Sequence, residues 1–283
     1  GSLYVGKNTQ LGNMQGVNST LTISGTGKVT TGSAVSAGYS KGYSTNLVVV
    51  SGKGSLRTTF LGTRSDQAAS KHTRLDIHLL DEGEITCTSS SAFQNQGYPD
   101  RGHELHVFVD GGTYYSYYNG TQTVFPPELT SVRVGTRGMT FGGNTRASGK
   151  WQYVGHDIAY TNTLPGETRK QVIFKGAGSK YMAYYRIFPG VTIDAPVRVS
   201  PYTFLEFSTN ATLVAGHGLE LQGTVRLLIH GGPRTFSKLA VGLSSTTAGD
   251  INFQLTTDSM ITVTGAVTHL GTSKSQIFLH PAD

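Results

Sequence analysis

Three carboxylates lie where a polysaccharide-cleaving enzyme would need them. The segment LLDEGE at 79–84 supplies Asp81 and Glu84, and a similar turn one repeat later supplies Asp110. A glycosidase uses two carboxylates roughly 5–10 Å apart, and neighbouring strands of a sheet lie about 4.8 Å apart. Asp81 and Asp110 could therefore lie side by side, with Glu84 nearby. Because Asp and Gly are also ordinary turn residues, catalysis here is the alternative hypothesis and not the leading one.

Two tyrosine-rich runs, TYYSYY at 113–118 and KYMAYYR at 180–186, suggest a binding surface. If Tyr114 points inward, strand alternation turns its neighbours toward solvent. Exposed tyrosines beside Lys and Arg form a flat platform on which sugar rings can stack, with cations for acidic groups. Tyrosine is also simply a good strand residue. The candidate ligand-binding residues are Tyr115, Tyr117, Lys180, Tyr184 and Arg186.

The sequence offers little for a metal or a cofactor. The HELH segment contains His103 and His106, but within a strand these two side chains point to opposite faces. Phosphate-binding loops, dinucleotide fingerprints and Gly-x-Ser-x-Gly elbows are absent from the sequence. We expect neither a metal site nor a cofactor.

Charge and composition narrow the choice of partner. The net charge of +6 favours anionic partners, but the basic residues are scattered, so a nucleic-acid partner is not expected. No apolar run approaches the roughly 18–20 residues of a membrane-spanning helix, so membrane insertion is not expected either. The single cysteine, Cys87, excludes an internal disulfide framework.

A repeat of about 27 residues organises the first half of the chain. The unit LTISGTGKV at 21–29 alternates apolar and polar residues around a Gly-x-Gly turn, and similar units follow. Periods of this length are typical of solenoids, so we expect an all-β parallel β-helix of roughly ten rungs. Alternation places Leu21, Ile23 and Val29 inside and Thr22 and Lys28 outside. Aligned turn glycines, 27, 29, 29 and 26 residues apart, are Gly27, Gly54, Gly83, Gly112 and Gly138.

The repeat weakens in the middle of the chain, where 40 residues separate Gly138 from Gly178. We therefore expect one β-solenoid domain over 1–283, with regular repeats at 3–138. Irregular rungs with a loop excursion would follow at 139–223, and regular C-terminal rungs at 224–283.

The units LYVG, STLTISGTGKVTTGS and LVVVSGKGSLRTTFLG resemble the β-strand repeats associated with autotransporter passengers and PEP-CTERM surface proteins. The resemblance is good over 3–62, fades toward 138 and is patchy beyond. It implies a right-handed β-solenoid exported to a bacterial surface, acting in adhesion or as a stalk. It transfers no catalytic residues, because the motif contains none.

The leading hypothesis is therefore a non-enzymatic, adhesin-type solenoid, secreted or on the outer bacterial cell surface, that binds glycans or a host or neighbouring cell surface. One alternative is a polysaccharide lyase, glycoside hydrolase or phage tailspike, since β-helices commonly carry such enzymes. Another is a structural stalk of a larger surface protein. Unpaired terminal rungs also make self-association possible.

Overall fold

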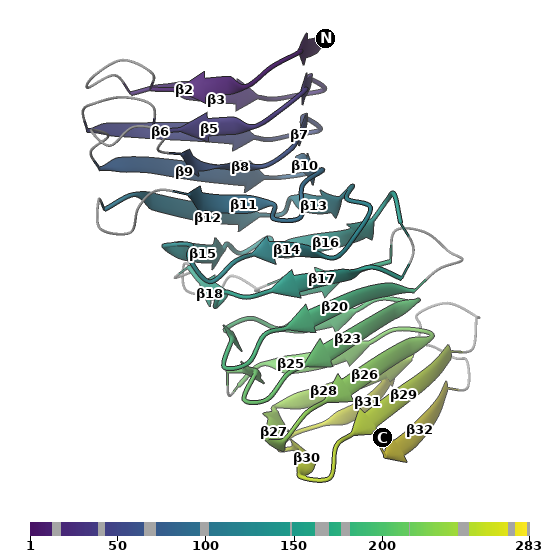
Figure 1. Cartoon of the computed structure of the whole chain (residues 1–283). Helices are drawn as coiled ribbons and strands as arrows, with labels where there is room; N and C mark the ends of the chain where they lie inside the picture. Colours follow the sequence, from purple (N-terminus) through teal and green to yellow (C-terminus); the bar gives the residue numbers. More distant parts are fainter. Residues whose placement is uncertain are drawn as a thin grey trace.

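The chain forms a parallel β-helix in which each coil stacks on the one before it (Figure 1). The computed structural model describes residues 1–12, 18–38, 43–64, 72–96, 102–147, 149–161, 170–176, 182–214, 216–242, 249–270 and 275–281. Within these ranges the regular structure is all strand, without a helix. The expected all-β parallel β-helix is confirmed.

One sheet, sheet A, runs the full length of the solenoid and receives one strand from each successive coil. Among the described residues it has eleven parallel strands. These are β1 (Ser2–Val5), β4 (Lys28–Thr31), β7 (Ser55–Thr58), β10 (Glu84–Cys87), β13 (Thr113–Ser116), β16 (Met139–Asn144), β19 (Val172–Phe174), β22 (Val197–Val199), β25 (Gly218–Leu221), β28 (Lys238–Gly242) and β31 (Val267–Leu270).

Two further sheets complete the N-terminal coils. Sheet B contains β2 (Thr9–Leu11), β5 (Val35–Ala37), β8 (Leu61–Arg64) and β11 (Phe93–Gln96). Sheet C contains β3 (Thr20–Ile23), β6 (Ser44–Val50), β9 (Thr73–Leu80), β12 (Glu104–Asp110), β15 (Ser131–Val134) and β18 (Ala159–Tyr160).

Different sheets complete the C-terminal coils. Sheet D contains β14 (Gln122–Phe125), β17 (Trp151–Val154), β20 (Ala183–Ile187), β23 (Thr203–Phe207), β26 (Val225–Ile229), β29 (Gly249–Leu255) and β32 (Ser275–Pro281). Two short two-stranded sheets close the third side. They are formed by β21 (Thr192–Ile193) with β24 (Thr212–Leu213), and by β27 (Gly232–Phe236) with β30 (Ser259–Val263).

Strict alternation of apolar and polar residues explains the strands. In β9, TRLDIHLL, every second side chain from Thr73 onward is buried and those between are exposed or half-buried. The same pattern holds in β12. Because the strands stack in register, buried positions form continuous inward rows, and the alternate positions form rows on the outer face. These outer rows are the places where a solenoid can carry function.

Glycine corners set the register between coils. A Cβ on Gly54 would lie 2.7 Å from the carbonyl oxygen of Ile23 in the coil below, so only glycine fits this turn. The expected alignment is wrong by one residue at its last step. Strand pairing matches Thr113 with Thr140, so Gly112 is level with Met139. Gly138 instead lies beside Gly111, whose N–H donates to the Gly138 carbonyl at 2.7 Å.

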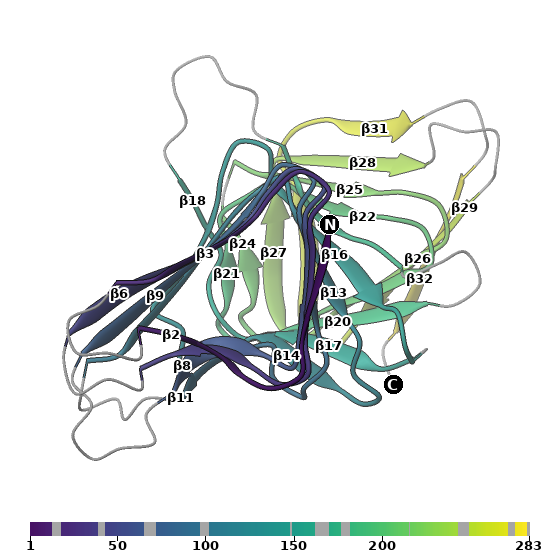
Figure 2. The same cartoon turned by 90° about the horizontal axis from the view of Figure 1, so that it is seen from above.

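The sheets change partners in the middle of the solenoid. The pairing of β13 with β16 and that of β14 with β17 each contain a register shift. In the described ranges, sheet B is joined to β14 by an isolated bridge between Ser91 and Thr123, and sheet C is joined to β21 by one between Ile158 and Ile193. Seen down the axis, N-terminal coils extend to one side and C-terminal coils to the other, while sheet A twists between them (Figure 2).

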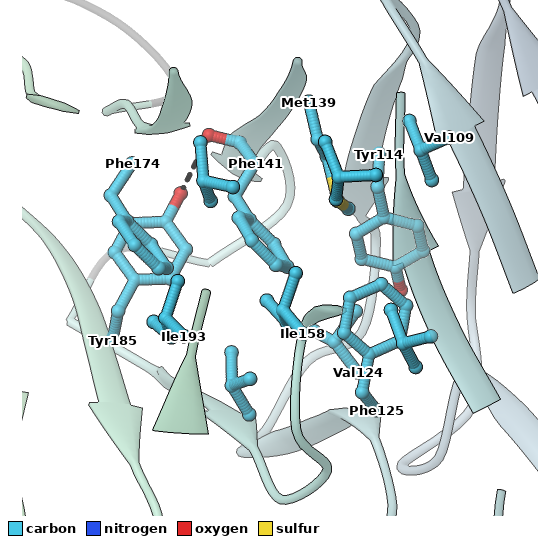
Figure 3. Packing of buried hydrophobic residues seen from close by; sticks show 14 of the residues in the cluster. Val109, Tyr114, Val124, Phe125, Met139, Phe141, Ile158, Phe174, Tyr185 and Ile193 are labelled. Carbon is cyan, nitrogen blue, oxygen red and sulfur yellow. Dashed lines mark hydrogen bonds between the residues drawn. The ribbon is translucent and has the colours of Figure 1, made fainter. Parts of the chain in front are cut away.

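Large aromatic side chains fill the core at this junction (Figure 3). The rings of Phe141 and Phe174 stack 4.9 Å apart, and Tyr185 packs edge-on against both. The Tyr185 hydroxyl donates to the carbonyls of Phe141 at 3.1 Å and Lys175 at 2.6 Å. One tyrosine of each run is thus structural, since Tyr114 and Tyr185 are fully buried.

Candidate functional site

An aromatic row lies on the outer face of sheet D. In-register pairing of three consecutive strands places Trp151 beside Tyr184 and Tyr184 beside Phe204. The Trp151 ring lies 5.2 Å from that of Tyr184 and 5.4 Å from that of Phe204, and the Tyr184 and Phe204 rings are 5.5 Å apart. All three side chains are half-buried. A continuous apolar platform spanning three coils therefore faces solvent.

Arg186 lies at the centre of this face. Its guanidinium carbon is 4.6 Å from the centre of the Trp151 ring and 5.5 Å from that of Tyr153. Phe188 packs on the other side of Tyr153, with the ring centres 5.0 Å apart. A planar guanidinium beside two electron-rich rings gains cation–π attraction. The sheet D face, defined as Trp151, Tyr153, Tyr184, Arg186, Phe188 and Phe204, combines stacking surface with a fixed cation.

A nearly buried carboxylate fixes this arginine. Glu206 follows Phe204 on the same face of β23, and its side chain is only 5% exposed. Its Oε1 lies 2.8 Å from Nε of Arg186 and 3.1 Å from Nε2 of His230. Two partners at one buried oxygen hold the guanidinium against the rings. The cation is therefore positioned before any ligand arrives.

The other tyrosine run lies on sheet A. Tyr115 is half-buried on the outer face of β13, and its ring covers Gly142, where a Cβ would collide with it. Burial first and the nearby Glu84 second raise the pKa of Tyr115. Tyr117 lies between two arginines, with the guanidinium carbons of Arg57 and Arg146 at 3.9 and 5.4 Å from its ring centre. This is a second, smaller pairing of aromatic and cationic groups.

The five sequence-predicted binding residues thus fall into separate groups. Tyr184 and Arg186 lie together on sheet D, whereas Tyr115 lies on sheet A and Tyr117 directly follows its strand. Lys180 lies outside the described residues. Tyr118, which alternation would place inside, is only half-buried because β13 ends at Ser116.

The three candidate catalytic carboxylates lie near the corner between sheets C and A. The Asp81 N–H donates to the Asp110 carbonyl at 2.9 Å, so the two residues are stacked neighbours. Arg137 bridges their side chains. Its Nε is 3.2 Å from Asp110 Oδ2, and its Nη1 contacts Asp81 Oδ1. One guanidinium engages both carboxylates, while Glu84 lies apart on the outer face of sheet A. The geometry is that of a bridged ion pair, in which both carboxylates are occupied by one arginine.

A hollow of about 530 Å³ lies on sheet A, next to this corner. Arg137, Lys170 and Arg198 give it a basic lining. Arg137 is committed to two aspartates, and Nε of Arg198 lies 3.0 Å from Glu220 Oε1. Internal ion pairs therefore take up most of its positive charge.

The HELH histidines lie as alternation requires. His103 is buried and His106 lies on the outer face of sheet C. Within the described ranges, no group of three or more His, Cys, Asp or Glu side chains is arranged to hold a metal ion. Cys87 is fully buried, and burial raises the pKa of its thiol far above the ordinary value, which makes it a packing residue. The part of the chain that the structure describes contains no helix with the length and apolarity needed to cross a membrane.

Sequence reasoning missed most of the sheet D face, because it treated the single Trp and its neighbours as part of an irregular segment. A usable signal was present. WQYV at 151–154, YYRI at 184–187 and FLEF at 204–207 each pair an outward aromatic residue with an outward Tyr, Arg or Glu two positions later.

Comparison with known proteins places the chain in no family. The search for a matching family model, for a similar curated protein and for a similar solved structure each found none.

Proposed function

We propose that this solenoid is a glycan-binding protein of the adhesin type, secreted or displayed on a bacterial surface, and that the sheet D face is its binding site. The observation that carries the proposal is the row of Trp151, Tyr184 and Phe204 beside a fixed Arg186. Sugar rings stack on aromatic faces through their C–H surfaces, and a positioned guanidinium pairs with uronate or sulfate groups.

Two further observations support this proposal. The platform crosses three coils spaced about 4.8 Å apart, so it suits an extended chain of sugars and not one small molecule. The net charge of +6 draws acidic polymers toward the solenoid. The resemblance of the N-terminal repeats to autotransporter and PEP-CTERM repeats supports display at a surface. The proposal assigns no catalytic role to Asp81, Glu84 or Asp110, since Arg137 occupies the stacked pair and Glu84 lies apart from it.

The single Trp of the chain provides a direct test, because Trp151 belongs to the proposed site. We would titrate the purified protein with acidic and neutral polysaccharides and follow tryptophan fluorescence, with mass spectrometry of the glycan afterwards. The proposal expects a saturable change with an acidic glycan and an unchanged polymer. Shortened or unsaturated products would favour an enzyme, and silence with every glycan would favour a stalk.

Variants locate the site. Arg186→Gln removes the cation and should weaken binding about 5–10-fold, and Tyr184→Ala should have a similar effect through lost stacking. Lys28→Gln is the matched control, because Lys28 is an exposed outward cation on β4. Tyr117→Ala asks whether the sheet A tyrosines contribute. If Arg186→Gln and Tyr184→Ala bind as well as Lys28→Gln, the sheet D face is not the site.

A further inference from the structure

A Ser–His–Glu row lies on the outer face of sheet C, away from the sheet D face. Strand pairing places His106 of β12 directly opposite Ser131 of β15, and Glu104 lies two residues before His106 on the same face. His106 Nδ1 is 2.8 Å from Ser131 Oγ, and its Nε2 is 3.1 Å from Glu104 Oε2. We propose that these three residues form an acyl-transfer centre that hydrolyses small carboxylic esters.

The hydrogen bonds favour the tautomer that such chemistry needs. A carboxylate has no proton to donate, so the bond with Glu104 places the imidazole proton on Nε2. The lone pair of Nδ1 then accepts the hydroxyl proton of Ser131. Nucleophile, base and orienting acid are thus joined in the order of a catalytic triad. The two ring nitrogens exchange the roles they have in serine proteases.

Neighbouring side chains hold the row in place. The other oxygen of Glu104, Oε1, lies 3.6 Å from Nε2 of His72. Asp76 is the strand neighbour of His106 on the side away from Ser131, and Nε of Arg74 binds its Oδ2 at 2.8 Å. Glu104, which contacts Nε2, is thus held in position to orient the imidazole while Ser131 gives up its proton.

The row opens into a hollow of about 420 Å³, large enough for an acetyl ester and part of its alcohol. Phe108 and His78 form its apolar wall, with their rings edge to face 5.5 Å apart. The N–H groups of a strand point along the sheet toward neighbouring strands and not toward its outer face, so the oxyanion needs a side-chain donor. Arg133 lines the same hollow, two residues beyond Ser131 on one face, and among the described residues its guanidinium has no carboxylate partner. We assign it to the oxyanion.

The reaction follows from these positions. Ser131 Oγ forms a bond to the ester carbonyl carbon as its proton passes to His106 Nδ1, and the carbonyl oxygen becomes an oxyanion facing Arg133. Collapse breaks the bond to the alcohol oxygen, which leaves with the proton from His106. Water then attacks the acyl-serine, with His106 accepting its proton and returning it to Ser131 Oγ as the carboxylic acid departs.

Active-site labelling tests this centre. We would treat the full chain with a fluorophosphonate, which phosphonylates an activated serine and releases fluoride, and locate the adduct by peptide mass spectrometry. Hydrolysis of p-nitrophenyl acetate is followed in parallel. The expected adduct is on Ser131, with a rate lowered at least about 100-fold in His106→Gln and no labelling at this position in Ser131→Ala. Ser55→Ala, which alters an outward serine on sheet A that no histidine contacts in the described part, should behave as wild type.

Glu104 acts through His106 and is a positioning residue, so its test needs a second readout. Glu104→Gln supplies an amide that can donate to Nε2 and thereby favours the tautomer protonated on Nδ1. Labelling should slow at least roughly 10-fold, and ¹⁵N NMR of His106 should show the change of tautomer. A labelling rate that falls with no change of tautomer would contradict this role.

The inference does not depend on glycan binding, because the two sites lie on different sheets. Tryptophan fluorescence and circular dichroism of each variant establish that it is folded. The proposal is overturned if the probe leaves Ser131 unmodified in the folded wild type. It is equally overturned if Ser131→Ala hydrolyses the ester as fast as Ser55→Ala.

Discussion

On the outer faces of sheets C and D, the same stacking of strands brings together different kinds of side chain. On sheet C, a serine, a histidine and a glutamate form one hydrogen-bonded row in which Glu104 is 34% exposed, with Asp76 on the neighbouring strand. On sheet D, adjacent strands bring three aromatic rings together, and Glu206 is 5% exposed beneath them. The row on sheet C is polar and partly exposed, whereas the row on sheet D is aromatic and its arginine is held by a nearly buried carboxylate.

The difference shows which positions of a solenoid are free to specialise. Inner rows in both halves are filled by the same kinds of apolar side chain, because every coil must cover the core of its neighbours. Side chains of the outer rows do not have to cover a neighbouring core, so each sheet can present different functional groups on its outer face. The predictions below test whether the two faces belong to one folding unit and whether their environments differ as the structure indicates.

The largest expected effect is on stability and arises at the junction between the N-terminal and C-terminal coils. Phe141→Ala removes a fully buried ring that packs against Phe125, Phe174 and Tyr185, and we expect it to lower the free energy of unfolding by about 3–5 kcal/mol. Urea unfolding followed by circular dichroism measures this. Phe204→Ala, at a half-buried ring on the outer face, is the matched control and should cost less than half as much.

Phe141→Ala also tests the comparison itself. A single transition at lower urea would mean that the two faces share one cooperative core. Two separated transitions in the variant would mean that the junction alone couples them.

The next effect compares the two glutamates. Glu206→Gln removes a nearly buried charge that binds Arg186 and His230, and should lower the free energy of unfolding by about 1–3 kcal/mol. Glu104→Gln makes the same change where the side chain is one-third exposed, and should cost about 0–1 kcal/mol. Chemical denaturation of both variants gives the difference. Equal losses would show that the sheet D face is as hydrated as sheet C.

Much of the fold could be predicted because the alternation of apolar and polar residues within each strand determines which side chains are buried. The pattern of LDIHLL in β9 gives its buried and exposed faces directly, and Ile23, Ile85 and Tyr114 are buried as the repeat requires. Only the one-residue error at Gly138 disturbed the predicted alignment of the N-terminal coils. The error arose because two glycines, Gly111 and Gly112, lie at this turn. Gly138 matches Gly111, since both have a positive φ, at +74° and +99°, whereas the repeat aligned it with Gly112.

The outer-face sites could not be predicted in the same way, because they depend on which coil lies beside which. Trp151 and Tyr184 are 33 residues apart, whereas Tyr184 and Phe204 are only 20 apart. Loop lengths between coils vary freely, since loops bear no stacking constraint. A fixed period of 26–29 residues therefore misses these neighbours. For the same reason, HELH was interpreted only as a possible metal motif, and the pairing of His106 with Ser131 was not predicted from the sequence.

A smaller effect compares the two cation–aromatic pairs. Arg57→Gln removes the guanidinium 3.9 Å from the Tyr117 ring and should lower the free energy of unfolding by about 0.5–1 kcal/mol. Arg186→Gln should cost more, because it also leaves Glu206 without its cation. Thermal unfolding at matched pH gives both values. A larger loss for Arg57→Gln would place the more strongly held cation on sheet A.

The smallest predicted effect is a pH dependence that belongs to sheet C. Burial lowers the pKa of His78 below its ordinary value of about 6.5, against the opposing field of Asp76 and together with that of Arg74. The unfolded chain then binds a proton more readily than the folded one, so this contribution to stability is complete above about pH 6.5 and is lost as the pH falls below it. His78→Gln should flatten that part of the profile, measured by urea unfolding between about pH 7.5 and 5. His230→Gln on sheet D, where the histidine instead pairs with Glu206, is the control and should leave the His78 component in place. If both variants change the profile alike, protonation affects the stability of the two faces in the same way. The contrast between the partly exposed polar row on sheet C and the aromatic row on sheet D, with its nearly buried carboxylate, would then not extend to their histidines.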